Sequence, residues 1–361
     1  MAFKLPNYVA PQFEQSCFLE APDVKMKSVE IAGTAPAGYH AMSIYPEYFK
    51  INGSWILATE SRMDCVPVYR DQSVQVIEFR NLKLGDLVIL GRSEDGSEGI
   101  LVHPKGFFDP TNPDKEAFAF RTGRSRETAY SKDYDDLYEL LRYEKANGGH
   151  IVWVLGPAVS FDFDARNAVS SLIEKGYINA LLAGNALATH DLEGAYLGSA
   201  LGQDIYTQES YYNGHYNHLD LLNKVRSYGS IEKFIQEEKL DNGIIHACVK
   251  QEVPFVLAGS IRDDGPLPEV FGNVYEAQDA MRVQARKATT LICLATQLHT
   301  IATGNMTPSY TVKDGKVRNV FIYCVDISEF VVNKLRDRGS LEVKTLITNV
   351  QDFVTQLDRN L

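Results

Sequence analysis

The sequence lacks the marks of several large protein classes. Its five cysteines among 361 residues are scattered and form no C-x-x-C pair, which indicates neither a disulfide framework nor a zinc site. No segment resembles a signal peptide, and the apolar runs end within about ten residues, too early to span a membrane. A net charge of −11 argues against binding a phosphate backbone. We therefore expect a cytoplasmic protein with no nucleic-acid or membrane partner.

Two kinds of pattern divide the chain. Residues 1–125 carry short alternating or apolar runs between turns, and Asn52-Gly53 between two such runs predicts a β-hairpin. Beyond a polar connection, helical stretches alternate with short apolar runs, as expected when parallel strands are covered on both faces. We predict an α/β protein with an N-terminal all-β domain, residues 1–125, followed by a Rossmann-like, doubly wound parallel-sheet domain, residues 126–361.

The same patterns place the individual elements. Expected strands of the first domain lie at 28–31, 48–51, 55–58, 74–79, 86–90 and 99–102. Those of the second lie at 151–155, 180–183, 255–258, 320–325 and 344–347, while 290–295 fits a strand or a buried helix equally well. Expected helices lie at 135–146, 165–175, 218–227, 230–238, 274–287 and 328–336.

Small or polar residues follow each apolar run of the second domain, where an open parallel sheet binds ligands in the crevice outside its carboxyl ends. Gly184 leaves one such strand, and its missing side chain would let backbone amides approach a pyrophosphate. The segment is not G-x-G-x-x-G, so ordinary turn chemistry is the competing interpretation. Asn185, next along the chain, fits a turn or a helix cap equally well.

Carboxylates follow two further strands. Asp326 ends the run NVFIYCVD, where an acidic residue can bind an adenosine ribose and favour NAD over NADP. Asp326 or Ser328 could equally cap the next helix. In the turn GSIRDDGPLP, Arg262 could hold a substrate carboxylate, while Asp263 or Asp264 could bind an amine or the cofactor. A local salt bridge with turn caps is the alternative there.

Histidines lie near the same strand ends. His190 follows the Gly184 turn, and His215 and His218 lie in NGHYNHLD. Histidine can move protons near neutral pH, although a structural role is the commoner one for any single histidine. Two histidines three residues apart could share a metal, yet no third ligand is evident, so we predict no metal.

Several long motifs carry a family resemblance. ALLAGNALATHDLE, GHYNHL, VPFVLAGSIRDDGPLP, TQLHTIATGN, CVDIS and DRGS occur in this order, after APAGYHAMSIYPEYFKINGSWI, Met63-Asp64-Cys65 and Lys83-Leu84-Gly85-Asp86 in the β half. From about residue 35 onward the chain resembles the archaeal-type ornithine cyclodeaminases. The same region resembles the cyclodeaminase half of cyanobacterial arginine dihydrolases and the lysine-oxoglutarate reductase/saccharopine dehydrogenase conserved region.

The resemblance implies an NAD-binding Rossmann-like domain that converts ornithine to proline with release of ammonia. It also implies a set of NAD contacts: Asn185, Ala186, Asp264, Thr296, Gln297, Leu298, His299, Asp326, Leu346, Ile347 and Asn349. For catalysis we assign Arg262 to the substrate carboxylate, Asp263 to the amine, and His215 or His218 to proton transfer. We expect an amino-acid substrate and a homo-oligomer, dimer or tetramer.

This chain departs from the family pattern in three places. We expect it to lack the small ferredoxin-like domain that precedes the β half in most relatives. After GPAV, where relatives usually have His-Thr-Gly, it has Ser160, Phe161, Asp162 and Phe163, and Asn349 stands where aspartate is usual. We expect these changes to leave cofactor binding intact and to affect which substrate is bound. Two competing hypotheses are an NAD-dependent amino-acid or opine-type dehydrogenase and a non-catalytic NAD sensor.

Overall fold

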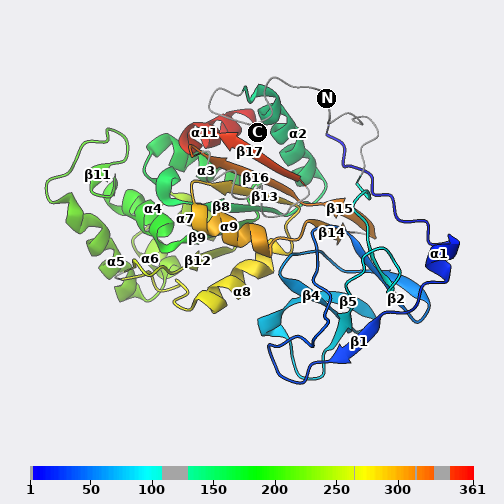
Figure 1. Ribbon diagram of the computed structural model, residues 1–361. Coiled ribbons are helices and arrows are strands. Elements are labelled where there is room, and N and C mark those ends of the chain that lie inside the picture. Colours follow the sequence, from blue (N-terminus) through cyan, green and yellow to red (C-terminus); the bar gives the residue numbers. More distant parts are fainter. Residues whose placement is uncertain (1–2, 108–128, 264, 314, 329–341) are drawn as a thin grey trace.

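A six-stranded parallel sheet organises the C-terminal part of the chain (Figure 1). The computed structural model describes residues 3–107, 129–263, 265–313, 315–328 and 342–361. Across the sheet the strands run β12 (Phe255–Ala258), β9 (Ala180–Gly184), β8 (Ile151–Leu155), β13 (Thr290–Leu294), β16 (Phe321–Asp326) and β17 (Glu342–Ile347). Numbered along the chain this is 3-2-1-4-5-6, the order of a Rossmann fold. The predicted fold class is confirmed.

Helices cover both faces of this sheet, because successive side chains of a buried strand point to opposite sides. Trp153 and Leu155 of β8 belong to one apolar core, and Val152 and Val154 belong to the other. The first core is covered by α2 (Ser131–Ala146), α3 (Phe163–Glu174), α4 (Asn185–Leu197), α5 (Asn217–Tyr228), α6 (Ile231–Glu237), α7 (Ile244–Lys250) and α11 (Val350–Asn360). The second is covered by α8 (Val274–Ala285) and α9 (Gln297–Met306).

Two antiparallel sheets make up the β half, residues 3–107. One has the order β1 (Lys25–Ser28), β6 (Leu87–Leu90), β4 (Cys65–Arg70), β5 (Ser73–Glu78), and the other β3 (Ser54–Leu57), β2 (Glu47–Ile51), β7 (Ile100–Val102). The predicted hairpin is confirmed: Asn52 and Gly53 join β2 to β3 with φ of 52° and 77°, as a tight hairpin turn requires. Short helices are α1 (Ser16–Leu19) and η1 (Phe79–Asn81).

Some expected elements differ from the structure. The ambiguous run is a strand, β13, while the strand predicted at 28–31 overlaps β1 at Ser28 alone, because β1 ends there. Strand β4 was missed, since Pro67 lies in its middle and proline rarely occupies a strand interior. The hairpin β14 (Tyr310–Lys313) and β15 (Lys316–Asn319) was also missed. The boundary at 125/126 and residues 329–336 of the last predicted helix lie outside the described residues.

Small elements complete the C-terminal part. They are η2 (Pro157–Ser160), η3 (Gly214–Tyr216), β10 (Ser199–Ala200) and β11 (Gln203–Asp204). Of the helices that the structure describes, none is both long and apolar enough to cross a bilayer. Within the same residues no group of three or more His, Cys, Asp or Glu side chains could hold a metal ion.

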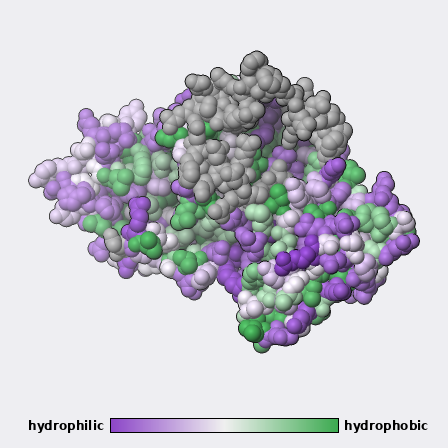
Figure 2. Space-filling model, viewed as in Figure 1, coloured by the Kyte–Doolittle hydropathy of each residue, from purple (hydrophilic) through white to green (hydrophobic). Residues whose placement is uncertain are grey.

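Polar contacts join the β half to the parallel-sheet half. The Tyr310 hydroxyl donates to the Ala58 carbonyl at 2.8 Å, and the Ser309 amide donates to the Ser61 carbonyl at 3.1 Å. Arg286, the residue that follows α8, pairs with the buried Glu60 at 3.0 Å. Figure 2 shows hydrophilic side chains gathered along this junction. The hairpin β14–β15 and helix α8 therefore fix the β half against the sheet.

A buried carboxylate holds α2 to the amino end of the sheet. Glu144 is fully buried, pairs with Arg318 of β15, and accepts hydrogen bonds from the hydroxyls of Thr289 at 2.9 Å and Thr290 at 3.1 Å. A side chain on Gly149 would place its Cβ 2.0 Å from the Glu144 carboxylate, so only glycine fits there. One carboxylate thus links α2, β13 and β15.

We expect Glu144→Ala to lower the free energy of unfolding by about 3–5 kcal/mol, because it leaves the Arg318 guanidinium buried without its partner. Glu139→Ala on the same helix is the matched control, since the Glu139 side chain is 36% exposed and its pair with Arg142 is worth at most about 1 kcal/mol. Urea denaturation measures both. Equal losses in the two variants would contradict the role given to Glu144.

Candidate active site

The loops that leave β8 and β13 touch at the carboxyl edge of the sheet. The Gly156 amide donates to the Leu294 carbonyl at 2.8 Å, and a Cβ on Gly156 would lie 2.0 Å from the Ala295 carbonyl oxygen. Ala295 itself has φ of +49°, an uncommon conformation for a residue with a side chain. The strand order reverses between β8 and β13, and open sheets bind ligands at that point.

Two helices present free backbone amides to this crevice. Gly184 precedes α4 and Thr296 precedes α9, and neither helix receives a hydrogen bond from a capping side chain. In two neighbouring helices, by contrast, a side chain accepts hydrogen bonds from the first backbone amides: Asp162 caps α3 and Asn349 caps α11. The uncapped amides and the positive end of the helix dipole favour an anion, such as the pyrophosphate of a dinucleotide.

Three predicted site residues meet beside the α4 turn. A Cβ on Gly184 would lie 2.9 Å from Cε1 of His299, so the glycine makes room for the imidazole. Burial lowers the pKa of His299 below its ordinary value, and the Asp263 carboxylate opposes part of that shift. Asp263 also accepts a hydrogen bond from the Ser260 amide at 2.7 Å. The turns after β9, β12 and β13 therefore converge, as the sequence predicted.

Asn185 fixes the position of one of these turns. Its side chain is 7% exposed, and its Oδ1 accepts a hydrogen bond from the Leu267 amide at 3.0 Å. Leu267 lies in the loop after β12, so the amide group holds that loop against α4. Asn185 is the first residue of α4, and Ala186 after it is half-buried. The Asn185 side chain therefore serves neither as a turn bond nor as a cap for its own helix.

The remaining predicted cofactor residues lie along the edge toward β17. Asp326 is half-buried at the end of β16, and one carboxylate oxygen accepts a hydrogen bond from the Ser328 amide at 2.8 Å. The helix that Asp326 or Ser328 was expected to cap lies outside the described residues. Leu346 and Ile347 are buried in the two cores, so only their backbone can reach a ligand. Thr296 is half-buried, while Gln297, Leu298 and Asn349 are exposed.

A second cluster lies between α4, α5 and the loop after β8. His190 is 8% exposed, and its Nδ1 is 2.9 Å from the Glu193 carboxylate. The Phe161 ring meets the His190 ring at 5.3 Å, and His218 lies 6.2 Å away between ring centroids. The unusual loop at Phe161 thus contacts the histidine pair.

Hydrogen bonds keep Glu193 ionised. Burial alone would raise its pKa, but bonds from His190, Ser199 and the Gly202 amide outweigh burial and hold the pKa below its ordinary value. Sequence reasoning missed this carboxylate. The usable signal was an acid three residues after a histidine within an apolar helix, a spacing that places both side chains on one face.

Two predicted catalytic residues lie apart from these clusters. Arg262 is exposed, and its backbone amide donates to the Ser260 hydroxyl at 3.1 Å. His215 is exposed, with its ring 4.4 Å from that of Tyr216. Asp264 lies outside the described residues. Of the two histidines proposed for proton transfer, His218 is the one that contacts the buried pair.

The strand order, the reversal at β8 and β13, and the uncapped helices define a Rossmann-type nucleotide-binding fold. The family described as arginine dihydrolase ArgZ-like, C-terminal, Rossmann fold matches residues 136–357. The chain is 37% identical over 353 residues to ornithine cyclodeaminase of Archaeoglobus fulgidus, covering 96% of this chain and 79% of that protein. The chain therefore belongs to the archaeal ornithine cyclodeaminase family, which is related to the cyclodeaminase part of ArgZ.

Solved structures agree with this assignment. A putative LOR/SDH protein of Methanococcus maripaludis superposes with a TM-score of 0.85 at 32% identity, covering 94% of this chain and 98% of that one. The ternary complex of AgrE with ornithine and NAD⁺ matches with a TM-score of 0.59 at 33% identity, covering 95% of this chain and 46% of that one. The resemblance stated from the motifs is confirmed.

Proposed function

We propose that this chain is a cytoplasmic, NAD-dependent ornithine cyclodeaminase that converts ornithine to proline and ammonia. The observation that carries the proposal is the strand-end crevice, where the turns after β9, β12 and β13 converge in a chain of this family. The five free cysteines agree with a reducing compartment. The reaction is redox-neutral overall, since the oxidation at Cα is reversed once the ring has closed.

The residues present fit a dinucleotide. The uncapped amides of α4 and α9 would hold its pyrophosphate, and Asp326 would accept hydrogen bonds from the adenosine ribose. Asn185 and Ala186, together with backbone groups at Leu346 and Ile347, would line the same crevice. When bound, NAD would supply a hydride acceptor and donor for the substrate Cα. A carboxylate at Asp326 would repel the extra phosphate of NADP.

The protein's own groups would bind and orient the substrate. We assign Arg262 to the carboxylate of ornithine and Asp263 to an amine, because both lie in the turn that follows β12. Asp263 is close to His299 there, while Arg262 is exposed. His218 would move the proton, supported by the ionised Glu193 through His190. Phe161 would exclude water from this end of the crevice through its ring contact with His190.

Incubation of the purified protein with ornithine and NAD should release ammonia and proline in equal amounts, with no net NADH. The physical reason is that each hydride removed from Cα returns to the same molecule. Amino-acid analysis, an ammonia assay and absorbance at the NADH band measure the three quantities. Net NADH would instead favour an amino-acid dehydrogenase, and tight NAD binding without turnover across ornithine, lysine and diaminobutyrate would favour a sensor.

We expect His218→Gln to lower kcat by about 10²-fold or more, the usual contribution of a general acid or base. His246→Gln is the matched control, since this histidine lies on α7 and takes no part in the proposed site. Steady-state kinetics at saturating ornithine and NAD, with near-unchanged KM values, test the assignment. If His215→Gln lowered kcat and His218→Gln did not, the role in proton transfer would belong to His215.

We propose that the chain forms a homo-oligomer, as a dimer or tetramer, through the lobe around β11 and η3. Large side chains are exposed there, with Tyr206 73%, Tyr212 95% and Leu201 56% exposed. Tyrosine is enriched in protein interfaces. Light scattering should return at least twice the 40.4 kDa chain mass, and Tyr212→Ser with Tyr206→Ser should shift the protein toward the monomer. A wild-type mass of one chain would refute the proposal.

A further inference from the structure

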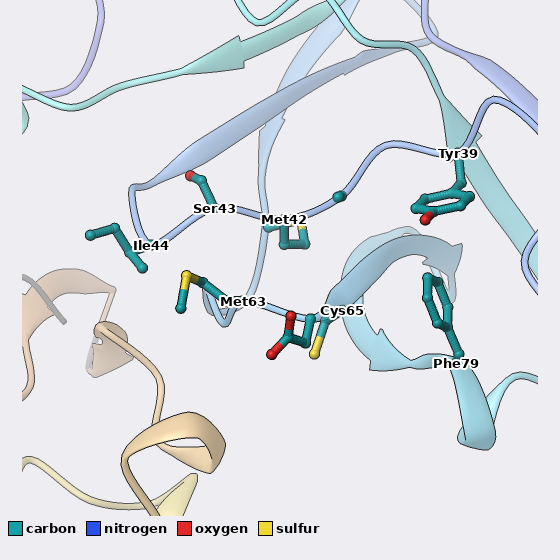
Figure 3. A pocket seen from close by; sticks show the side chains of 9 residues that line it. Tyr39, Met42, Ser43, Ile44, Met63, Cys65 and Phe79 are labelled. Carbon is teal, nitrogen blue, oxygen red and sulfur yellow. The ribbon is translucent and has the colours of Figure 1, made fainter. Parts of the chain in front are cut away.

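The β half contains a pocket that is separate from the strand-end crevice. It has a volume of about 420 Å³ and lies between the segment 39–44, the turn 63–65 and η1. Figure 3 shows the rings of Tyr39 and Phe79 at one end and the side chains of Met63 and Ile44 at the other. The proposed cyclodeaminase reaction uses none of these residues.

The pocket walls are mainly apolar and polarisable. The Tyr39 and Phe79 rings meet edge to face at 5.1 Å, and the thioethers of Met42 and Met63 line the same space. The Arg92 guanidinium already lies 5.8 Å from the centroid of the Tyr39 ring, so this ring interacts with a cation of the protein itself. Thioethers adapt to flexible aliphatic chains. The Met42 amide donates to the Cys65 carbonyl at 3.0 Å, which ties the two walls together. These walls suit an alkyl chain.

One formal charge faces this space, from Asp64. Burial raises the pKa of the Cys65 thiol to about 12, so this sulfur stays neutral. Among the described residues no side chain forms a hydrogen bond or an ion pair with the Asp64 carboxylate. Asp64 has φ of +61°, a left-handed conformation that aspartate and asparagine tolerate better than most residues.

We propose that this pocket binds the primary ammonium group of a linear aliphatic amine, with Asp64 as its counter-ion. The alkyl chain lies against Met42 and Met63, and the ammonium pairs with the Asp64 carboxylate. An anion is disfavoured, because the carboxylate would repel it. This site is independent of the proposed cyclodeaminase reaction, because it holds no residue of the strand-end crevice and requires no NAD.

The test is calorimetric titration of the full chain, without NAD, using 1,4-diaminobutane and n-butylammonium. Neither probe has a carboxylate for Arg262, and the Asp64→Asn variant separates binding at this pocket from any amine held by Asp263. Both should bind the wild type, while n-butanol, of the same length and without charge, should not. The affinity should fall at higher salt, because an accessible ion pair is screened.

Asp64→Asn is the informative variant, since asparagine keeps the shape and tolerates the left-handed backbone. It should lower the affinity for both amines by roughly tenfold or more, the loss expected when a charge-assisted contact is removed. Asp71→Asn is the matched control, because Asp71 is also exposed, has φ of +51°, and lies outside the pocket. It should leave both affinities unchanged.

A second variant covers the case of a misfolded Asp64→Asn. Met63→Ala keeps Asp64 and removes part of the apolar wall, and it should weaken the binding of n-butylammonium several-fold. No amine binding by the wild type, or equal binding by wild type and Asp64→Asn, would overturn the proposal. Loss of cyclodeaminase activity alone, with amine binding intact, would count against the proposed function and leave this site standing.

Discussion

The rest of the structure depends on the complete burial of β8 at the centre of the parallel sheet. All five of its residues are inaccessible to solvent, with hydrogen-bonded neighbours on both sides and helices over both faces. A strand in this position has no free side chain for chemistry, because every one is used for packing. Ligand binding therefore falls to the turns at the carboxyl edge, and close approach of those turns requires glycine at position 156.

Helix α4 combines structural and chemical roles in the same way. It is buried along most of its length and yet carries Asn185, His190, Asp191 and Glu193. Asp191 pairs with Arg166 at 2.7 Å and accepts the first amides of α7, so its charge is fully used within the fold. One ring nitrogen of His190 is hydrogen-bonded to Glu193, and the His190 ring lies next to the His218 ring of α5. Adjacent polar residues on one helix thus serve different purposes.

The sequence predicted the sheet well, because buried parallel strands are continuous apolar runs that end in small or polar residues. Five strand ends were predicted to lie at one edge, while the run at 290–295 was left undecided between a strand and a helix. Gly184 and His299 lie side by side at that edge, with Asp263 close enough to affect the pKa of His299. Local patterns failed where tertiary contacts decide the outcome. Strand β4 was missed because Pro67 lies within it. The sequence spacing indicated only His190 as a partner of Glu193, because Ser199 and Gly202 are brought to this carboxylate by the fold.

Helix α9 provides the physical connection between the crevice and the β half. It begins at the crevice, carries His299 in its first turn, and is followed by Ser309, whose hydroxyl donates to the Ile44 carbonyl in the wall of the amine pocket. Its ten residues span about 15 Å as one rigid element. Contiguity alone does not couple two sites. An amine bound in the β half would alter the crevice only if α9 had two alternative positions and the amine bound the protein more tightly with α9 in one of them. A ligand can shift such an equilibrium by no more than the difference between its two binding free energies.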